Sequence, residues 1–361
     1  MTTAEALIAC DDINEALAFY VDRLGFRVDS IFPAEAPSVA VLRGYGLRLR
    51  LDPAAPRSPA AIRISSTDLH AMGGEGRIVA PDGTTIDIVD ADPPIVLPPL
   101  QQSFVLERAS DDASWTAGRA GMRYRDLIPD RQGGRFIGSH ICIPTAGPVS
   151  DYVHFHKIRF QMIYCYKGWT RLVYEDQGEP FIMKAGDCVL QPPRIRHRVL
   201  ESSAGLEVIE IGCPALHETF ADPETDLPTM DVRPERDFGG QRFAFHRAET
   251  ATWHSSADGF ARRRFGFREA TDGLAEASVL RTSPQSSTGA SVALHVALQS
   301  VDAEFYFMFV LAGHATLLRS EHGGEALAPG DSFVMPSNQK FALTERSPDV
   351  ELLEVILPAH R

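Results

Sequence analysis

Residues 1–92 combine one helical stretch with several short stretches that are typical of strands. Between Asp12 and Leu24, apolar side chains recur every three or four positions, which places them on one face of a helix. Asp11 or Asp12 can cap the start of this helix, and Gly25 ends it. Short apolar runs between turn residues then predict strands over 28–32, 39–42, 47–51, 61–65, 77–80 and 84–89. The pattern therefore predicts a small α+β domain.

From about residue 121 onward the pattern changes to short strand-like runs separated by turn residues, which predicts a mainly β region built as a sandwich or barrel. Clustered prolines between residues 93 and 99 indicate a linker over 93–120. Further prolines and the Gly239-Gly240 pair indicate a second linker over 221–240. The predicted division is therefore 1–92, a linker at 93–120, 121–220, a linker at 221–240, and 241–361.

The β region contains an internal repeat. The segments that match are Tyr164–Gly168 with Phe309–Gly313, Ala185–Asp187 with Pro329–Asp331, Pro192 with Pro336, and Glu201 with Glu345. The two matched glycines lie 18 residues apart in the first copy and 17 in the second. Such self-similarity predicts two barrels of similar structure.

Composition and charge restrict the classes of partner. The chain has 361 residues and a formal net charge of −13, which argues against nucleic acid or an anionic membrane surface as a partner. Its five cysteines are widely spaced without a C-x-x-C pair, as in a reduced cytosolic protein. We find no signal peptide and no apolar run long enough to span a membrane. We therefore expect a cytoplasmic protein that acts on a small molecule.

A His-x-His pair lies in the first half of the β region. Residues two apart on a strand point to the same face, so one strand can aim His154 and His156 at a single point. His197 follows a Gly-Asp turn and a Pro-Pro step, and it can return on a neighbouring strand as a third imidazole. Three neutral imidazoles on a rigid sheet form a site for a divalent transition metal. The alternative is three core histidines that hydrogen-bond one another.

Residues 147–201 resemble the two sequence motifs of the cupin superfamily. The matching positions are His154, His156, Gln161 and Gly168 in the first motif, and Gly186, Pro192 and His197 in the second. The departures are Gln161, where the family has glutamate, and Arg194 and Glu201 in place of a later glycine and asparagine. The resemblance implies a jelly-roll barrel that binds metal through His154, His156 and His197, with Gln161 at the position of a fourth ligand.

The second copy resembles a cupin barrel that has lost its metal ligands. Tyr306 stands at the position of Gln161, and Phe341 stands at the position of His197. The His pair falls near Gln299 and Val301, and the nearest histidine, His295, is out of register. The resemblance implies a bicupin whose second barrel is a structural partner without metal, with Tyr306, Phe307 and Phe341 as packing residues.

Residues 5–90 resemble a small vicinal-oxygen-chelate module of the glyoxalase/bleomycin-resistance type. The resemblance rests on the segments 11–20, Leu24–Phe26 and 81–87. The family's metal positions fall near Glu5 and at Asp87, and neither is a histidine. We therefore expect a docking or dimerisation module and a homodimeric protein. The fold class as a whole is mainly β, with two cupin jelly-roll barrels preceded by a small α+β domain.

Gln161 is the departure that most affects the chemistry of the predicted site. A neutral amide adds no negative charge, so the site keeps the charge of its metal and should favour an anionic substrate. The amide can ligate the metal, bind a metal-bound water or the substrate, or only fill space. We also name Tyr152 and Arg196 as candidate catalytic or substrate-binding residues, although a surface role is the simpler interpretation of Arg196.

Strand alternation predicts the surroundings of Gln161. With Gln161 inward, Ile163 and Cys165 face the barrel interior as well. Phe160, Met162 and Tyr164 then face an opposing layer or a partner subunit.

These observations favour a metal-dependent cupin enzyme, with an Fe(II) dioxygenase of a small anionic, enolic or aromatic substrate as the leading hypothesis. Three histidines leave positions for substrate and O₂, as in the three-histidine iron centres that this site resembles. Zn, Mn, Ni or Cu can use the same ligands, and a non-redox isomerase, lyase, cyclase or hydrolase is the first alternative. The second alternative is a ligand-binding bicupin without catalysis.

Overall fold

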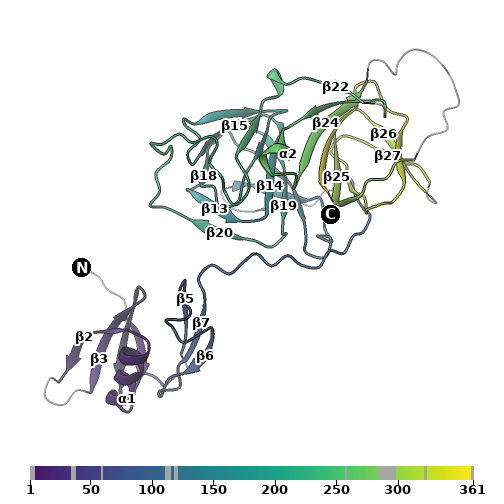
Figure 1. Ribbon diagram of the computed structural model, residues 1–361. Coiled ribbons are helices and arrows are strands. Elements are labelled where there is room, and N and C mark those ends of the chain that lie inside the picture. Colours follow the sequence, from purple (N-terminus) through teal and green to yellow (C-terminus); the bar gives the residue numbers. More distant parts are fainter. Residues whose placement is uncertain are drawn as a thin grey trace. The chain divides into compact units, whose positions relative to one another are not determined.

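The computed structural model describes residues 5–33, 38–57, 60–109, 115–117, 121–256, 258–283, 298–320 and 323–358. His295 lies outside the described residues. The chain divides into two compact units, Met1–Pro94 and Ile95–Arg361 (Figure 1). Strands dominate both units, which confirms the predicted mainly β fold class. None of the helices in the described part of the chain is long and apolar enough to cross a membrane.

The first unit is an α+β domain with two small sheets. Its helix α1 (Ile13–Leu17) continues as the π-helix η1 (Ala18–Arg23), as the apolar period of the sequence predicts. The Asp12 carboxylate caps this helix by accepting from the backbone N–H groups of Asn14 and Glu15. The sheets have the orders β1-β4-β3-β2 and β5-β7-β6. Their strands are β1 (Ala6–Ala9), β2 (Arg27–Phe32), β3 (Val39–Gly44), β4 (Leu47–Asp52), β5 (Ala61–Ser66), β6 (Gly76–Val79) and β7 (Thr85–Asp90).

The second unit begins with a barrel of two sheets, which we call the first barrel. The larger sheet has the order β21-β17-β14-β19-β11-β10-β9, and the smaller has the order β16-β15-β18-β13-β20 with β12 beside β18. The strands are β9 (Thr116–Ala117), β10 (Arg123–Asp126), β11 (Ile137–Ile143), β12 (Gly147–Pro148), β13 (His154–Lys157), β14 (Phe160–Lys167), β15 (Trp169–Tyr174), β16 (Phe181–Lys184), β17 (Cys188–Leu190), β18 (His197–Ser202), β19 (Leu206–Cys213), β20 (Glu218–Ala221) and β21 (Ala244–His246).

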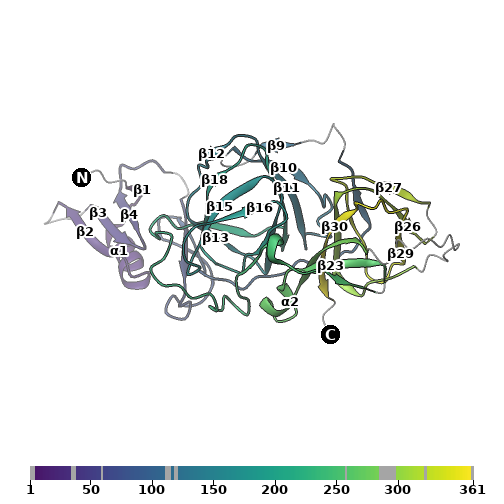
Figure 2. The ribbon, with the colours of Figure 1, turned by 90° about the horizontal axis from the view of Figure 1, so that it is seen from above.

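The second barrel follows after the short 3-10 helix η3 (Ala248–Thr250), and the two barrels lie side by side (Figure 2). Its sheets have the orders β22-β23-β24-β30-β25-β28-β8 and β27-β26-β29. The elements are β8 (Val105–Glu107), β22 (His254–Ser255), β23 (Phe260–Arg264), α2 (Phe267–Ala270), β24 (Glu276–Thr282), β25 (Ala303–Ala312), β26 (Ala315–Arg319), β27 (Glu325–Leu327), β28 (Ser332–Val334), β29 (Phe341–Thr344) and β30 (Glu351–Pro358).

The two barrels exchange their leading strands. β8 precedes the first barrel in the chain but pairs with β28 of the second, and β21 precedes the second barrel but pairs with β17 of the first. Matching aspartates fix both exchanged segments, because Asp187 accepts from the Ala248 N–H at 2.8 Å and Asp331 accepts from the Ala109 N–H at 2.7 Å.

This exchange differs from the division drawn from the sequence. The segment 93–120 was predicted to be a linker, yet it supplies β8 and β9 to two sheets. β21, at residues 244–246, was assigned to the second barrel but completes a sheet of the first. A strand of three residues is too short to show a period, so only its long-range pairing reveals it.

Alternate side chains of β14 serve two cores. Phe160, Met162 and Tyr164 are buried in a cluster that also contains Phe305, Phe307 and Phe309 of β25, so this cluster fills the space between the barrels. Gln161 and Ile163 point the other way and line a cavity inside the first barrel, with Cys165 buried beside them. The predicted alternation is thus seen, and the opposing layer is the second barrel. Each fully buried aromatic side chain contributes about 2–3 kcal/mol to the free energy of folding.

A buried ion-pair group also joins the barrels. The Glu304 carboxylate on β25 is 5% exposed and accepts from Arg135 at 2.7 Å and from Arg159 at 2.9 and 3.0 Å. Burial alone would raise the pKa of Glu304, but the hydrogen bonds from Arg159 and Arg135 hold it below the ordinary value of 4.5. The ionised form is therefore favoured in the folded state.

We expect Glu304→Gln to lower the free energy of unfolding by about 2–4 kcal/mol, because it removes a buried carboxylate that pairs with two partly buried guanidinium groups. Since the folded-state pKa is depressed, the contribution of Glu304 is present above pH 4.5 and is lost as the pH falls through the folded-state pKa. Urea unfolding monitored between pH 3 and pH 7 measures both effects. The control is Glu201→Gln, whose partner Arg171 is 43% exposed and which should change stability by less than about 1 kcal/mol.

Candidate metal centre

Three histidines converge at one end of the first barrel. His154 and His156 alternate on β13, and His154 lies directly opposite His197, the first residue of β18. Their ligand atoms all lie within 4.8 Å of one another. The ring centroids are 4.3 Å apart for His154 and His197, 5.2 Å for His154 and His156, and 5.3 Å for His156 and His197. The structure thus brings the three predicted ligands together.

The other nitrogen of each imidazole is held by an acceptor on the protein. His154 Nδ1 bonds the Tyr152 carbonyl at 2.8 Å, and His197 Nδ1 bonds the Ile195 carbonyl at 3.0 Å. A carbonyl can only accept, so both rings carry their proton on Nδ1, and Nε2 is the nitrogen whose lone pair can bind a metal. His156 Nδ1 lies 2.8 Å from the Thr219 hydroxyl, which can accept in the same way. The donor set therefore fits a divalent transition metal.

A buried carboxylate adds negative charge behind this cluster. Asp151 Oδ1 lies 3.7 Å from His154 Nδ1, and the Asp151 side chain is fully buried. Its other oxygen accepts from the Val199 N–H at 3.0 Å, which fixes the carboxylate beside β18. A carboxylate in this place raises the basicity of the imidazole and so strengthens it as a ligand.

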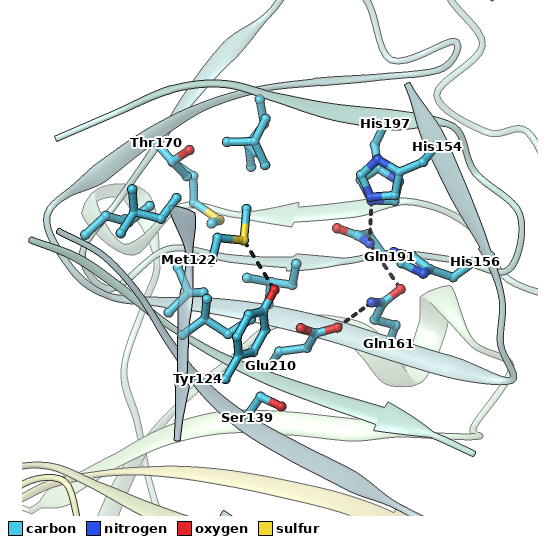
Figure 3. Close-up of a pocket in the computed structure, with 18 of the residues that line it drawn as sticks. Met122, Tyr124, Ser139, His154, His156, Gln161, Thr170, Gln191, His197 and Glu210 are labelled. Carbon is cyan, nitrogen blue, oxygen red and sulfur yellow. Dashed lines mark hydrogen bonds between the residues drawn. The ribbon is translucent and has the colours of Figure 1, made fainter. Parts of the chain in front are cut away.

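Gln161 belongs to a directed chain of hydrogen bonds that reaches the histidines. The Tyr174 hydroxyl donates to Gln191 Oε1 at 2.7 Å, and Gln191 Nε2 lies 3.1 Å from Gln161 Oε1 and 3.3 Å from His197 Nε2. Gln161 Nε2 then donates to Glu210 Oε1 at 2.5 Å (Figure 3). Complete burial raises the pKa of Tyr174, so its hydroxyl remains a donor. The chain turns the oxygen of Gln161 toward Gln191 and its NH₂ group toward Glu210.

The histidines lie at one end of a cavity of about 260 Å³ inside the first barrel. Most of the surface that lines it is apolar, and the aliphatic side chains include Ile141, Ile163, Leu172, Val199 and Val208. Polar groups are few, and Glu210, Tyr124 and Ser139 lie together on one wall of the cavity, as Figure 3 shows. Such a cavity suits a small organic molecule with one or two polar groups.

Sequence reasoning missed six polar residues of this cavity, namely Glu210, Gln191, Tyr124, His217, Ser139 and Thr170. His217 lies near the cluster, with its ring 5.4 Å from that of His156. For Glu210 a signal was present, because Glu207 and Glu210 in the last strand of the first copy match Glu351 and Glu354 in the last strand of the second. For the other five we find no local motif, since the pairing of distant strands brings them to the cavity.

Arg196 and Tyr152 lie outside this cavity. The Arg196 guanidinium is bound by Asp222 and Glu175 and covers the Phe155 ring at 5.1 Å. Because Arg196 directly precedes the inward His197, strand alternation turns it outward, and the predicted clamp on a substrate is corrected to a structural ion pair. Tyr152 meets the His154 ring at 5.7 Å with its own side chain 48% exposed, and it precedes β13 in an irregular segment where the two-residue period does not apply.

At the positions that correspond to Gln161 and His197, the second barrel has the buried side chains of Tyr306 and Phe341. Phe341 and Tyr306 are buried with ring centroids 5.4 Å apart, and Gln299 forms an isolated bridge with Phe341. Phe307 is buried between the barrels. No cluster of histidine, cysteine or acidic side chains with metal-ligand spacing is present in the described residues of this barrel.

Comparison with known proteins agrees with this architecture. Residues 3–91 match the family model of the Glyoxalase/Bleomycin resistance protein/Dioxygenase superfamily. The crystal structure of protein Ylba from E. coli, of family DUF861, aligns with a TM-score of 0.50 at 12% identity over 74% of this chain and 94% of that chain. Oxalate decarboxylase from Bacillus subtilis at pH 4.6 aligns with a TM-score of 0.48 at 13% identity over 69% and 75% of the two chains. A comparison with curated proteins gives no match. The likeness to Ylba shows a shared fold.

We expect Thr219→Val to weaken the binding of Mn(II) or Co(II) by about tenfold, because the His156 ring loses the group that orients it while all three imidazoles remain. Isothermal titration of the metal-free protein measures the affinity. Thr219→Ser keeps the hydroxyl and should bind like the wild type. An equal loss in both variants would contradict the role assigned to the hydroxyl.

Proposed function

We propose that the first barrel binds one divalent transition metal through His154, His156 and His197 and forms the active centre of a metal-dependent enzyme. The observation that carries this proposal is the convergence of three Nε2 lone pairs at the end of an apolar cavity, with each Nδ1 held from behind.

The leading reaction class is oxygenation of a small organic substrate by an Fe(II) dioxygenase. Three neutral ligands on one side leave positions for a substrate and O₂, and iron bound there would supply the dioxygen chemistry of non-haem centres. The uncharged Gln161 leaves the positive charge of the metal undiminished, which favours an enolate, carboxylate or phenolate group of the substrate next to the histidines. The aliphatic walls exclude water from the remainder of the substrate.

A non-redox reaction is the second candidate, because the carboxylate of Glu210 also lines the cavity and can act as a base. Glu210 can accept a proton from a substrate held at the metal end, as an isomerase, lyase or cyclase requires. Zn, Mn or Ni would then serve as a Lewis acid.

We expect anaerobically purified protein to contain about one transition-metal ion per chain, as three imidazole ligands require, and His156→Ala to retain less than about a tenth of it. Elemental analysis measures the metal, and an oxygen electrode records consumption with enolic and phenolic substrates.

His217→Ala is the matched control, because this histidine lies beside His156 but outside the converging cluster, and it should retain the metal. Metal retention in His156→Ala would overturn the proposed site. Full turnover without oxygen would replace the dioxygenase by the non-redox candidate, and the absence of any turnover with bound metal would favour a ligand-binding bicupin.

A further inference from the structure

Equivalent strands of the two barrels carry a glutamate at the same place. In the first barrel, β14 pairs with β19 so that Ile163, two residues after Gln161, lies opposite Glu210. In the second barrel, β25 pairs with β30 so that Met308, two residues after Tyr306, lies opposite Glu354. Glu210 and Glu354 therefore occupy corresponding positions, and the two barrels can be compared group by group.

The carboxylate of Glu354 has its partners within the protein. Its Oε1 accepts from the Tyr306 hydroxyl at 2.9 Å, and its Oε2 accepts from the Ser278 hydroxyl at 3.1 Å. Arg262 Nε approaches Oε2 at 3.5 Å and supplies the counter-charge. The glutamate of the second barrel is thus neutralised and hydrogen-bonded on both oxygens.

The corresponding surroundings of Glu210 are open. By the register of the strands, Ser139 of the first barrel corresponds to Ser278 of the second, and Tyr124 corresponds to Arg262. Oε1 of Glu210 accepts from Gln161, but Oε2 has no hydrogen-bond partner among the described residues. The Tyr124 hydroxyl instead contacts the Met122 sulfur at 3.4 Å.

Glu210 lines the cavity, so its second carboxylate oxygen can accept a hydrogen bond from a donor on a molecule bound there. The three histidines line the same cavity. A ligand in the cavity therefore meets the metal at the histidines and a hydrogen-bond-accepting carboxylate on the wall beside Gln161.

We propose that Glu210 is the specificity-determining residue of the first barrel, and that it binds a hydroxyl or amino group of a substrate whose other polar group binds the metal. The substrate is then a molecule with an apolar body, a metal-binding head and one hydrogen-bond donor placed to reach Glu210. A compact dianion does not fit this class, because its second charge would face the Glu210 carboxylate. This inference rests on the proposed metal site.

The test uses the full-length protein loaded with Co(II), whose visible absorption reports ligands that enter the metal's coordination sphere. The probes are benzohydroxamate derivatives that carry a hydroxyl or a methyl group at the 3- or 4-position, so that each pair differs only in the donor. We expect one hydroxyl isomer to bind at least about tenfold more tightly than its methyl counterpart, as a hydrogen bond to a charged acceptor provides. Glu210→Gln should reduce this preference at least about threefold and leave the bound Co(II) unchanged.

Glu354→Gln is the matched control from the second barrel, and it should keep the full preference for the hydroxyl isomer. Equal affinities of the hydroxyl and methyl probes in the wild type, or an unchanged preference in Glu210→Gln, would overturn the role of Glu210 while leaving the metal site intact. Wild-type protein that binds no Co(II) would overturn the metal site and this inference together. The cobalt content of each sample separates these two failures.

Discussion

The packing of the two large sheets against each other is the constraint on which the metal centre depends. β14 provides the link, because Phe160, Met162 and Tyr164 are buried against β25 while Gln161 and Ile163 line the cavity on the opposite face. The side chains that pack against β25 fix the position of β14 along the sheet and its rotation about its own axis. The inward side chains are thereby fixed too, and with them the hydrogen-bond chain that ends at His197. The second barrel stabilises the site, and none of its described residues belongs to the histidine cluster.

The charged and neutral polar groups of the cavity occupy separate places. The neutral imidazoles lie together, and the negative charge of Asp151 stays behind the histidines rather than inside the cavity. Glu210 provides negative charge on the cavity wall next to the neutral amide of Gln161. The amides of Gln161 and Gln191 lie between Glu210 and His197 and are oriented by their partners, since the NH₂ of Gln161 must face the carboxylate and the oxygen of Gln191 must face the tyrosine hydroxyl.

The parts of this arrangement that the sequence predicted are those with a local period. His154, His156 and the alternation of β14 follow from the two-residue repeat of a strand, and His197 follows from its spacing after a turn. The exchanged strand β8 and the position of Glu210 depend instead on pairings between segments far apart in the chain. The role named for Arg196 failed for a related reason. Its neighbour His197 points into the barrel, so Arg196 points outward, and its partner Asp222 lies on a distant segment of the chain.

The exchange of leading strands also affects how the two barrels can be separated. A cut in the connection between β20 and β21 would divide the covalent chain between the barrels, but each fragment would still carry a strand that completes a sheet of the other. The fragments would remain interlocked through β8–β28 and β21–β17, and neither could leave without unpairing an edge of both sheets. The two-barrel unit is therefore one cooperative body whose halves are not independent modules, and a gene encoding either half alone would specify an incomplete barrel.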